Sequence, residues 1–201
     1  KFDQAHYARI LATYERLAQA SRAQLIVMPE TAIPRFLERI DPGYLSRLEA
    51  IARRNGGDLL LGVPVHDGAR EYYNSAVSFG SSPRQRYDKV HLVPFGEFVP
   101  PGFGWVLSVL RIPLSDFSAG SDRQRPLAIA GQKVAVSVCY ENAFGEEVLR
   151  QLPEASLLVN ISNVAWFGDS LAPGQHLQIA QMRAIETRRT VLTATNTGRT
   201  A

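Results

Sequence analysis

The chain has 201 residues, of which 45% are hydrophobic and 20% are charged. This composition is typical of a globular protein, so we expect residues 1–201 to form one domain around one substantial core. The net charge of +3 comes without a block of Lys or Arg, and no run of 18 apolar residues is present. These two facts argue against a nucleic-acid partner and against a membrane span within the chain.

Helical and strand-like patterns alternate in the first half of the chain. Residues 3–21 carry apolar side chains at helical spacing, and residues 25–28 form a continuously apolar run, typical of a strand buried on both faces. Asp41 and Pro42 are typical of a helix start, and a glycine pair at 56–57 stops that helix. Strands are predicted at 58–64 and 72–80.

The second half repeats the alternation. Strands are predicted at 133–138, 157–161 and 191–196, with helices at 145–152 and 173–189 between them. Alternating strands and helices indicate a layered α/β protein. Because residues 72–79 partly alternate between polar and apolar, we expect a mixed sheet or two packed sheets, and not a purely parallel sheet.

Three polar residues directly follow apolar strands. They are Glu30, Cys139 and Asn163. Open α/β sheets place their functional sites at the carboxyl ends of their strands, so these side chains are candidates for one site. Alone, two of them have a simpler interpretation: Glu30 as a surface acid and Cys139 as a buried core thiol.

Cys139 is the only cysteine, so it cannot form a disulfide within the chain, and a disulfide-stapled secreted module is excluded. A thiol is mostly protonated at neutral pH and needs a base to become a nucleophile. Glu30 is the candidate base, and Lys89, in a predicted loop, is the candidate group to stabilise a thiolate and an oxyanion. A backbone N–H after the nucleophile is a further oxyanion donor. These parts predict a cysteine acyl-transfer site.

Other titratable residues have weaker support. Glu97 and Glu141 are candidates to orient Lys89 or the thiol, although spacing alone does not distinguish them from solvent-exposed acids. The four histidines, at positions 6, 66, 91 and 176, lack metal-ligand spacing. We therefore predict no metal and no cofactor, with His91 and His176 as possible hydrogen-bonding groups near a site.

Residues 94–113 form an unusual apolar segment that has no charge between Phe98 and Leu110. Four prolines and three glycines exclude one long helix. The segment is either a loop folded onto the core or an apolar lid that meets a lipid surface. The candidate lid residues, including a second apolar loop after residue 165, are Phe95, Phe98, Phe103, Trp105, Trp166 and Phe167.

Several short motifs together resemble the nitrilase, or carbon-nitrogen hydrolase, superfamily, and within it the apolipoprotein N-acyltransferase family. The motifs cover nearly the whole chain, and those around Lys89 and Trp166 are specific to the acyltransferases. They lie at residues 29–34, 73–75, 87–100, 139–141, 161–170, 175–177, 182–184 and 194–196. Two positions depart from the family pattern: Val164 replaces a usual Asp, and Met28 stands where an aromatic residue is common.

The resemblance implies a nitrilase-like αββα sandwich, incomplete at its C-terminus, and a Glu-Lys-Cys triad of Glu30, Lys89 and Cys139. It implies Glu97 and Glu141 as supporting acids, with Tyr140 beside the nucleophile. It also implies a periplasm-facing domain of a bacterial inner-membrane protein. Flanking membrane helices are then expected before and after the given residues.

The function that this resemblance implies is transfer of a fatty acyl chain. The donor is a phospholipid, the acceptor is the N-terminal amine of a diacylglyceryl-cysteine apolipoprotein, and a Cys139 thioester is the intermediate. Two alternatives remain open at this point: a soluble amidase that uses the same triad with water, and a non-catalytic lipoprotein-binding scaffold.

Overall fold

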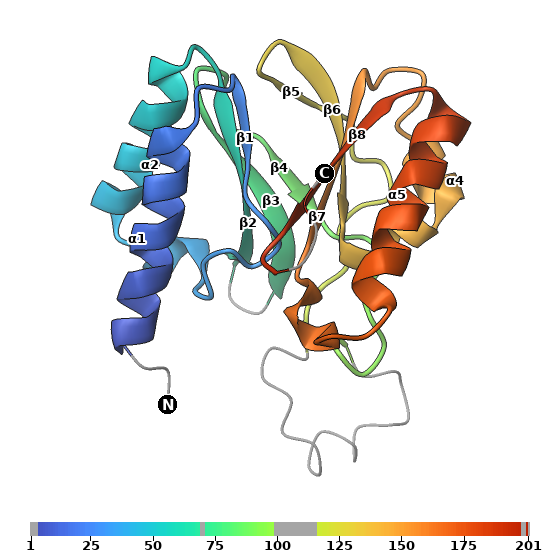
Figure 1. Ribbon diagram of the computed structural model, residues 1–201, viewed down its shortest axis with the longest axis horizontal. Helices are drawn as coiled ribbons and strands as arrows, with labels where there is room; N and C mark the ends of the chain where they lie inside the picture. The colour runs from blue at the N-terminus through green and yellow to red at the C-terminus, as the bar shows by residue number, and fades with distance from the viewer. Residues whose placement is uncertain (1–3, 69–70, 99–115, 198–199, 201) are drawn as a thin grey trace.

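Two four-stranded sheets lie face to face, and helices cover the outer side of each sheet (Figure 1). The computed structural model describes residues 4–68, 71–98, 116–197 and 200. Helices α1 (Gln4–Ala20) and α2 (Pro42–Arg54) cover one sheet. Helices α4 (Gly145–Leu149) and α5 (Ala172–Thr187) cover the other. This four-layer arrangement confirms the expected αββα sandwich.

The first sheet has the strand order β1-β2-β3-β4. Its strands are β1 (Leu25–Val27), β2 (Asp58–Asp67), β3 (Glu71–Gly80) and β4 (Arg86–Asp88). β1 runs parallel to β2, whereas β2, β3 and β4 pair antiparallel. The sheet is therefore mixed, as the partial alternation of residues 72–79 predicted.

The second sheet has the order β5-β6-β7-β8. Its strands are β5 (Leu127–Ile129), β6 (Gln132–Val138), β7 (Leu157–Ser162) and β8 (Thr190–Thr195). β5 and β6 are antiparallel, and β6, β7 and β8 are parallel. Because parallel strands end at a common edge, the residues that follow β6 and β7 lie at the same end of this sheet.

The two-residue period of the strands separates the core into layers. In β2, Leu59 and Leu61 pack with the buried residues of α1 and α2, whereas Leu60 packs between the two sheets. In the second sheet Val134, Val136 and Val138 also face the inter-sheet layer. Burial of both faces explains why these strands read as continuous apolar runs in the sequence.

The helix start at residue 42 agrees with the expectation. Asp41 accepts hydrogen bonds from the backbone N–H of Gly43 at 3.2 Å and of Tyr44 at 3.1 Å, which satisfies two of the free donors at the start of α2. Pro42 occupies the first turn, where no hydrogen-bond donor is lost.

Five short elements were not predicted: strands β4 and β5 and the 3₁₀ helices η1 (Leu37–Arg39), η2 (Cys139–Ala143) and η3 (Val164–Phe167). Each has at most five residues, too few to establish a period. The prediction that strand 25–28 is buried on both faces was only partly right. β1 pairs with β2 alone among the described strands, so its three residues stay half-buried at the sheet edge.

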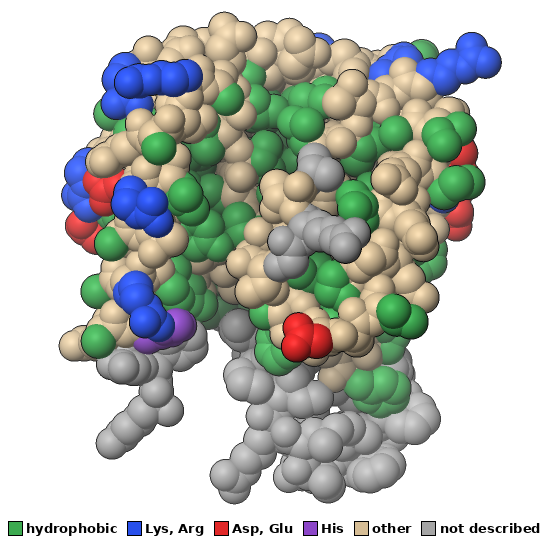
Figure 2. Space-filling view, in the orientation of Figure 1, with side chains coloured by type: hydrophobic (Ala, Val, Ile, Leu, Met, Phe, Trp, Pro, Cys, Tyr) green, Lys and Arg blue, Asp and Glu red, His purple; other side chains and the backbone are tan. Residues whose placement is uncertain are grey.

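Figure 2 shows hydrophobic side chains between the α1–α2 half and the α5 half of the molecule. They lie where the two halves of the molecule meet. Partly buried residues such as Leu25, Val27 and Leu192 pack against the inter-sheet layer. Charged side chains gather on the outer surfaces instead. Among the described residues, no helix combines the length and the apolar character needed to cross a bilayer.

Candidate active site

The two sheets meet at a hydrogen bond between residues that follow β1 and β7. The backbone N–H of Asn163 donates to Glu30 Oε2 at 2.7 Å. Glu30 is buried, with 6% of its surface exposed, so it is not the surface acid of the simpler interpretation. Two of the residues expected at strand ends, Glu30 and Asn163, therefore come together from different sheets, with Asn163 making this contact through its backbone.

Lys89 follows β4 and lies between two carboxylates. Its Nζ is 2.7 Å from Glu97 Oε2 and 3.7 Å from Glu30 Oε1, and its side chain is 1% exposed. Burial alone would lower the pKa of Lys89, but the charges of Glu30 and Glu97 outweigh it and raise the pKa. The ammonium is therefore held charged inside the protein.

Asn74, in β3, joins the same groups. Its Nδ2 donates to Glu30 Oε1 and to Glu97 Oε1, each at 2.7 Å, and its backbone carbonyl accepts the N–H of Lys89 at 2.8 Å. The backbone N–H of Val93 also donates to Glu97, at 2.9 Å. No role was predicted for Asn74 from the sequence. Its place in the motif at residues 73–75 was the only signal available.

Cys139 is the first residue of η2 and adopts a left-handed backbone conformation, with φ of 56°. Such a conformation is strained for a residue with a Cβ and is often found at functional sites. The residue is 8% exposed. The pKa of the thiol is raised to about 12, first by burial and then by the charge of Glu30, while Lys89 and a hydrogen bond from the Tyr140 N–H act in the opposite direction. The resting thiol is therefore protonated and needs a base.

Glu141 is buried and accepts hydrogen bonds from both sides of the site. Its Oε1 accepts the backbone N–H of Val90 at 2.6 Å and of His91 at 3.0 Å. Its Oε2 accepts the backbone N–H of Val138 at 2.7 Å and the hydroxyl of Tyr87 at 3.2 Å. Burial raises the pKa of Glu141 to about 6, although these hydrogen bonds oppose the shift. Glu141 thus ties η2 to the segment that follows Lys89.

Tyr140 belongs to an aromatic cluster beside Lys89. Its ring meets Phe144 at 5.2 Å and His91 at 5.3 Å, both edge to face, and the His91 and Phe144 rings stack at 3.7 Å. Lys89 Nζ lies 5.9 Å from the centre of the Tyr140 ring. His91 Nδ1 is also 2.9 Å from Glu147 Oε1. These contacts fix the backbone that follows Cys139.

The apolar lid candidates are exposed, half-buried or outside the described residues. Trp166 is 83% exposed, Phe95 and Phe167 are each 39% exposed, and Phe98 is half-buried. Phe103 and Trp105 lie outside the described residues, as does most of the predicted 94–113 lid. His176, on α5, lies 5.6 Å from the Phe167 ring. Burial lowers the pKa of His176, and the charges of Glu30 and Lys89 act on it in opposite directions.

Both departures from the family pattern are buried. Val164 has 2% of its surface exposed, and its backbone N–H donates to Asn196 Oδ1 at 3.1 Å. The side chain of Asn163 accepts from Asn196 Nδ2, so the loop keeps a hydrogen-bonded form without an acid at position 164. Met28 is 3% exposed and packs in the layer between the first sheet and its helices.

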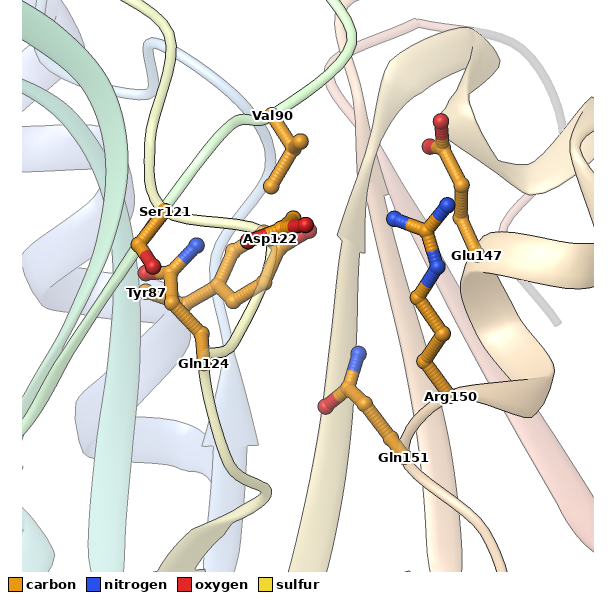
Figure 3. A pocket seen from close by; sticks show the side chains of 8 residues that line it. All are labelled: Tyr87, Val90, Ser121, Asp122, Gln124, Glu147, Arg150 and Gln151. Atoms are coloured by element: carbon orange, nitrogen blue, oxygen red, sulfur yellow. The ribbon is translucent and has the colours of Figure 1, made fainter.

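Figure 3 shows a pocket whose lining includes none of Glu30, Lys89 and Cys139. Tyr87, Ser121 and Asp122 line one side, and Glu147, Arg150 and Gln151 line the other. Within the described part of the chain, no group of three His, Cys, Asp or Glu residues has the arrangement of a metal site.

Comparison with known protein families identifies the family of this chain. The profile of the carbon-nitrogen hydrolase family matches residues 1–201. The chain belongs to the carbon-nitrogen hydrolase family. The family resemblance inferred from the short motifs is thereby confirmed.

Within the carbon-nitrogen hydrolases, the chain is similar to curated apolipoprotein N-acyltransferases. An apolipoprotein N-acyltransferase from Nitrosomonas europaea is 54% identical over 204 residues, covering 100% of this chain and 41% of the relative. Those from Methylococcus capsulatus and Chromobacterium violaceum are 52% and 49% identical, covering 88% and 95% of this chain and 35% and 38% of the relatives. The chain thus spans about two fifths of the length of these relatives.

Three solved structures with similar folds support the observed architecture. The NitFhit protein of C. elegans aligns with a TM-score of 0.70 at 19% identity, covering 97% of this chain and 49% of that one. A carbon-nitrogen hydrolase from Helicobacter pylori G27 aligns with a TM-score of 0.68 at 18% identity, covering 96% and 69%. An amidase from Nesterenkonia sp. aligns with a TM-score of 0.65 at 24% identity, covering 96% and 70%.

Proposed function

We propose that the protein is an acyltransferase that moves a fatty acyl chain from a phospholipid to the N-terminal amine of a diacylglyceryl-cysteine apolipoprotein. One observation carries the proposal. The chain is 54% identical to an apolipoprotein N-acyltransferase. In it Glu30, Lys89 and Cys139, which follow strands of two different sheets, lie close enough for the charges of Glu30 and Lys89 to act on the thiol.

In the first step Glu30 takes the proton of the Cys139 thiol as the sulfur attacks the ester carbonyl carbon of the phospholipid. The Lys89 ammonium and the backbone N–H of Tyr140 stabilise the oxyanion of the tetrahedral intermediate. The ester C–O bond then breaks, and Glu30 returns the proton to the departing glycerol oxygen. A lysophospholipid leaves, and the acyl chain remains on Cys139 as a thioester.

In the second step the amine of the apolipoprotein attacks the thioester carbonyl. Glu30 accepts a proton from the amine, Lys89 again stabilises the oxyanion, and the C–S bond breaks. The proton passes to the departing sulfur, which restores the thiol. In both steps the carboxylate is the base. The Cys139 thiol, whose pKa is raised to about 12, depends on this adjacent base to react as a nucleophile.

Supporting roles follow from the contacts. Glu97 holds Lys89 at 2.7 Å, and Glu141 fixes the backbone before Cys139, at Val138, and the backbone after Lys89, at Val90. The exposed Trp166 and Phe167, with Phe95, Phe98 and the undescribed Phe103 and Trp105, are proposed to contact the lipid. A location at the bacterial inner membrane with this domain facing the periplasm accords with lipid and lipoprotein substrates.

The amidase alternative is not favoured, because the curated relatives at 42–54% identity are N-acyltransferases, whereas the solved amidases are below 25% identity. A non-catalytic scaffold has no need for a buried ammonium between two carboxylates, since burying charged groups costs several kcal/mol per ion.

The proposal is tested by mass spectrometry of the intact protein in phospholipid vesicles. We expect the Cys139 peptide to gain the mass of one palmitoyl-sized chain as a thioester. Addition of a diacylglyceryl-cysteine peptide should then remove this mass and transfer it to the peptide amine. Acyl transfer by a Cys139→Ala variant at the wild-type rate would overturn the proposal.

A further inference from the structure

Asn160 lies in β7 behind Cys139 and contacts the strand that carries it. Its Nδ2 donates to the backbone carbonyl of Cys139 at 3.0 Å and to Ser137 Oγ at 3.0 Å. The residue is 2% exposed. One buried amide therefore bonds to residues on both sides of Val138, where β6 ends and η2 begins.

The orientation of this amide is fixed by a second side chain. The hydroxyl of Ser162, which is fully buried, donates to Asn160 Oδ1 at 2.7 Å. With the amide reversed, Oδ1 would face the carbonyl oxygen of Cys139, and two acceptors would oppose each other. Only the observed orientation gives every contact a donor and an acceptor.

The backbone of Cys139 explains why such a partner is needed. β6 pairs with β7 as far as Val138, opposite Ile161, and the chain then leaves the ladder. At Cys139 the φ of 56° turns the backbone out of the strand and into η2, so its carbonyl takes no part in the β6–β7 ladder. Asn160 gives this carbonyl a side-chain donor that anchors it to β7.

We propose that Asn160 is a positioning residue for Cys139. By holding the Cys139 carbonyl and Ser137 together, it fixes the left-handed turn, and with it the direction of the Sγ atom and of the Tyr140 N–H. Asn160 acts through the backbone and does not touch the substrate. This inference rests on the proposed role of Cys139 as the nucleophile.

The test compares Asn160→Asp with Thr193→Val in the intact protein. Aspartate keeps the shape and the acceptor for Ser162 but lacks the Nδ2 donor. Thr193 is also buried and lies opposite Asn160 in β8, whereas the side-chain bond to the Cys139 carbonyl comes from Asn160. For Asn160→Asp we expect the single-turnover rate of thioester formation to fall ~10- to 100-fold, with the half-saturating phospholipid concentration unchanged. For Thr193→Val the rate should stay within about twofold of wild type.

The outcomes separate this inference from the proposed function. Absence of a Cys139 thioester in the wild-type protein would refute the function itself. A wild-type protein that acylates, together with an Asn160→Asp variant that acylates equally fast, would refute the positioning role alone. Should Asn160→Asp fail to fold, Asn160→Ala is measured in its place, and an unchanged acylation rate in that folded variant refutes the role equally.

Discussion

At the scale of single residues, the Glu30 carboxylate has two opposite effects on Cys139. Its charge raises the pKa of the thiol, which disfavours the thiolate, yet as a neighbouring base it is proposed to accept the thiol proton during attack. A single substitution can therefore separate electrostatic influence from proton transfer.

We predict that Glu30→Gln lowers the pKa of Cys139, because the substitution removes a negative charge and leaves the Lys89 ammonium in place. Alkylation of the thiol by iodoacetamide at a fixed pH near 8 should become faster than in wild type. Thioester formation from phospholipid should become slower by ~100-fold or more, since the general base is lost. Both rates are measured by mass spectrometry of the Cys139 peptide.

Asn74→Ala is the matched comparison, since it leaves both carboxylates charged but removes the donor between them. It should not accelerate alkylation. If Glu30→Gln instead slows alkylation and acylation by the same factor, Glu30 acts only by holding the site together.

Glu141 gives a prediction about pH. Its pKa in the folded protein is about 6, above the ordinary 4.5, so the folded protein holds this proton more tightly than the unfolded chain. The resulting stabilisation is present below pH 4.5 and is lost as the pH rises through 6, an effect of ~2 kcal/mol. Urea unfolding between pH 4.5 and 7.5 should show this decline in wild type and not in Glu141→Gln. A parallel decline in both proteins would assign it to another group.

Single residues of the site also differ in how far the sequence predicts them. Glu30 and Cys139 were identifiable because each follows a continuous apolar run, a pattern that places a side chain at a sheet edge. Asn74 and Asn160 lie inside strands, where a polar residue has no distinctive spacing. Their partners are brought close only by the pairing of strands distant in sequence, which no local pattern encodes.

At the scale of elements, Gly62 in β2 allows the loop that carries Glu30 to cross closely over the strand. A Cβ at this position would lie 2.2 Å from the carbonyl oxygen of Pro29 and 2.7 Å from the Cα of Glu30. The Gly62 carbonyl also accepts the N–H of Ala32 at 3.0 Å. The position of Glu30 therefore depends on the absence of a side chain on a neighbouring strand.

We predict that Gly62→Ala lowers the free energy of unfolding by ~1–3 kcal/mol, because the loop must move to relieve the overlap. Thioester formation should slow by ~10-fold or more through displacement of Glu30. Gly174→Ala, in α5, is the control, since nothing lies within 4 Å of its Cβ position. That variant should be neutral or slightly more stable. Equal stability and equal rates for the two variants would contradict the proposed crossing.

The elements themselves were predictable to the extent that they were long. α1, α2 and β3 have periods that extend over ten or more residues, and their bounds were close to those expected. β4 and β5 have three residues each and are held by pairing with a longer neighbour. Such strands depend on tertiary contacts more than on local propensity.

At the scale of the whole molecule, Asp58 connects the two sheets. It begins β2, and it accepts the backbone N–H of Ala130, in the β5–β6 turn, at 2.7 Å. It also accepts the hydroxyl and the backbone N–H of Ser82, at 2.7 and 2.9 Å. Burial alone would raise the pKa of Asp58, but these hydrogen bonds outweigh it and lower the pKa.

We predict that Asp58→Ala destabilises the protein by about 3 kcal/mol at pH 7, because three donors lose a charged acceptor. Asp67→Ala, which breaks an ion pair with Arg86 at a 55%-exposed side chain, should cost less than about 1 kcal/mol. Since a lowered pKa stabilises the fold only above the unfolded value of 3.8, the difference between the two variants should shrink as the pH falls below that value. Unfolding in urea at pH 7 and pH 3 measures it; a difference independent of pH would contradict the role of the Asp58 charge.

The layered fold class followed from alternation along the sequence, but the way the sheets pack did not. Periodicity shows that β2 and β6 are buried on both faces and does not show that they face each other. That arrangement depends on contacts such as Asp58 with Ala130 and Glu30 with Asn163, which join residues 72 and 133 positions apart.

The pairing of one ammonium with two carboxylates has a consequence for inhibitors. With the thiol protonated, the groups around Cys139 carry an excess of one negative charge, at Glu30 and Glu97 against Lys89. An anionic warhead must therefore approach against this charge and lose its hydration in a confined space. Covalent ligands should be neutral or cationic near the reactive carbon, so iodoacetate should label this cysteine more slowly than iodoacetamide, relative to the rates of the two reagents with free glutathione.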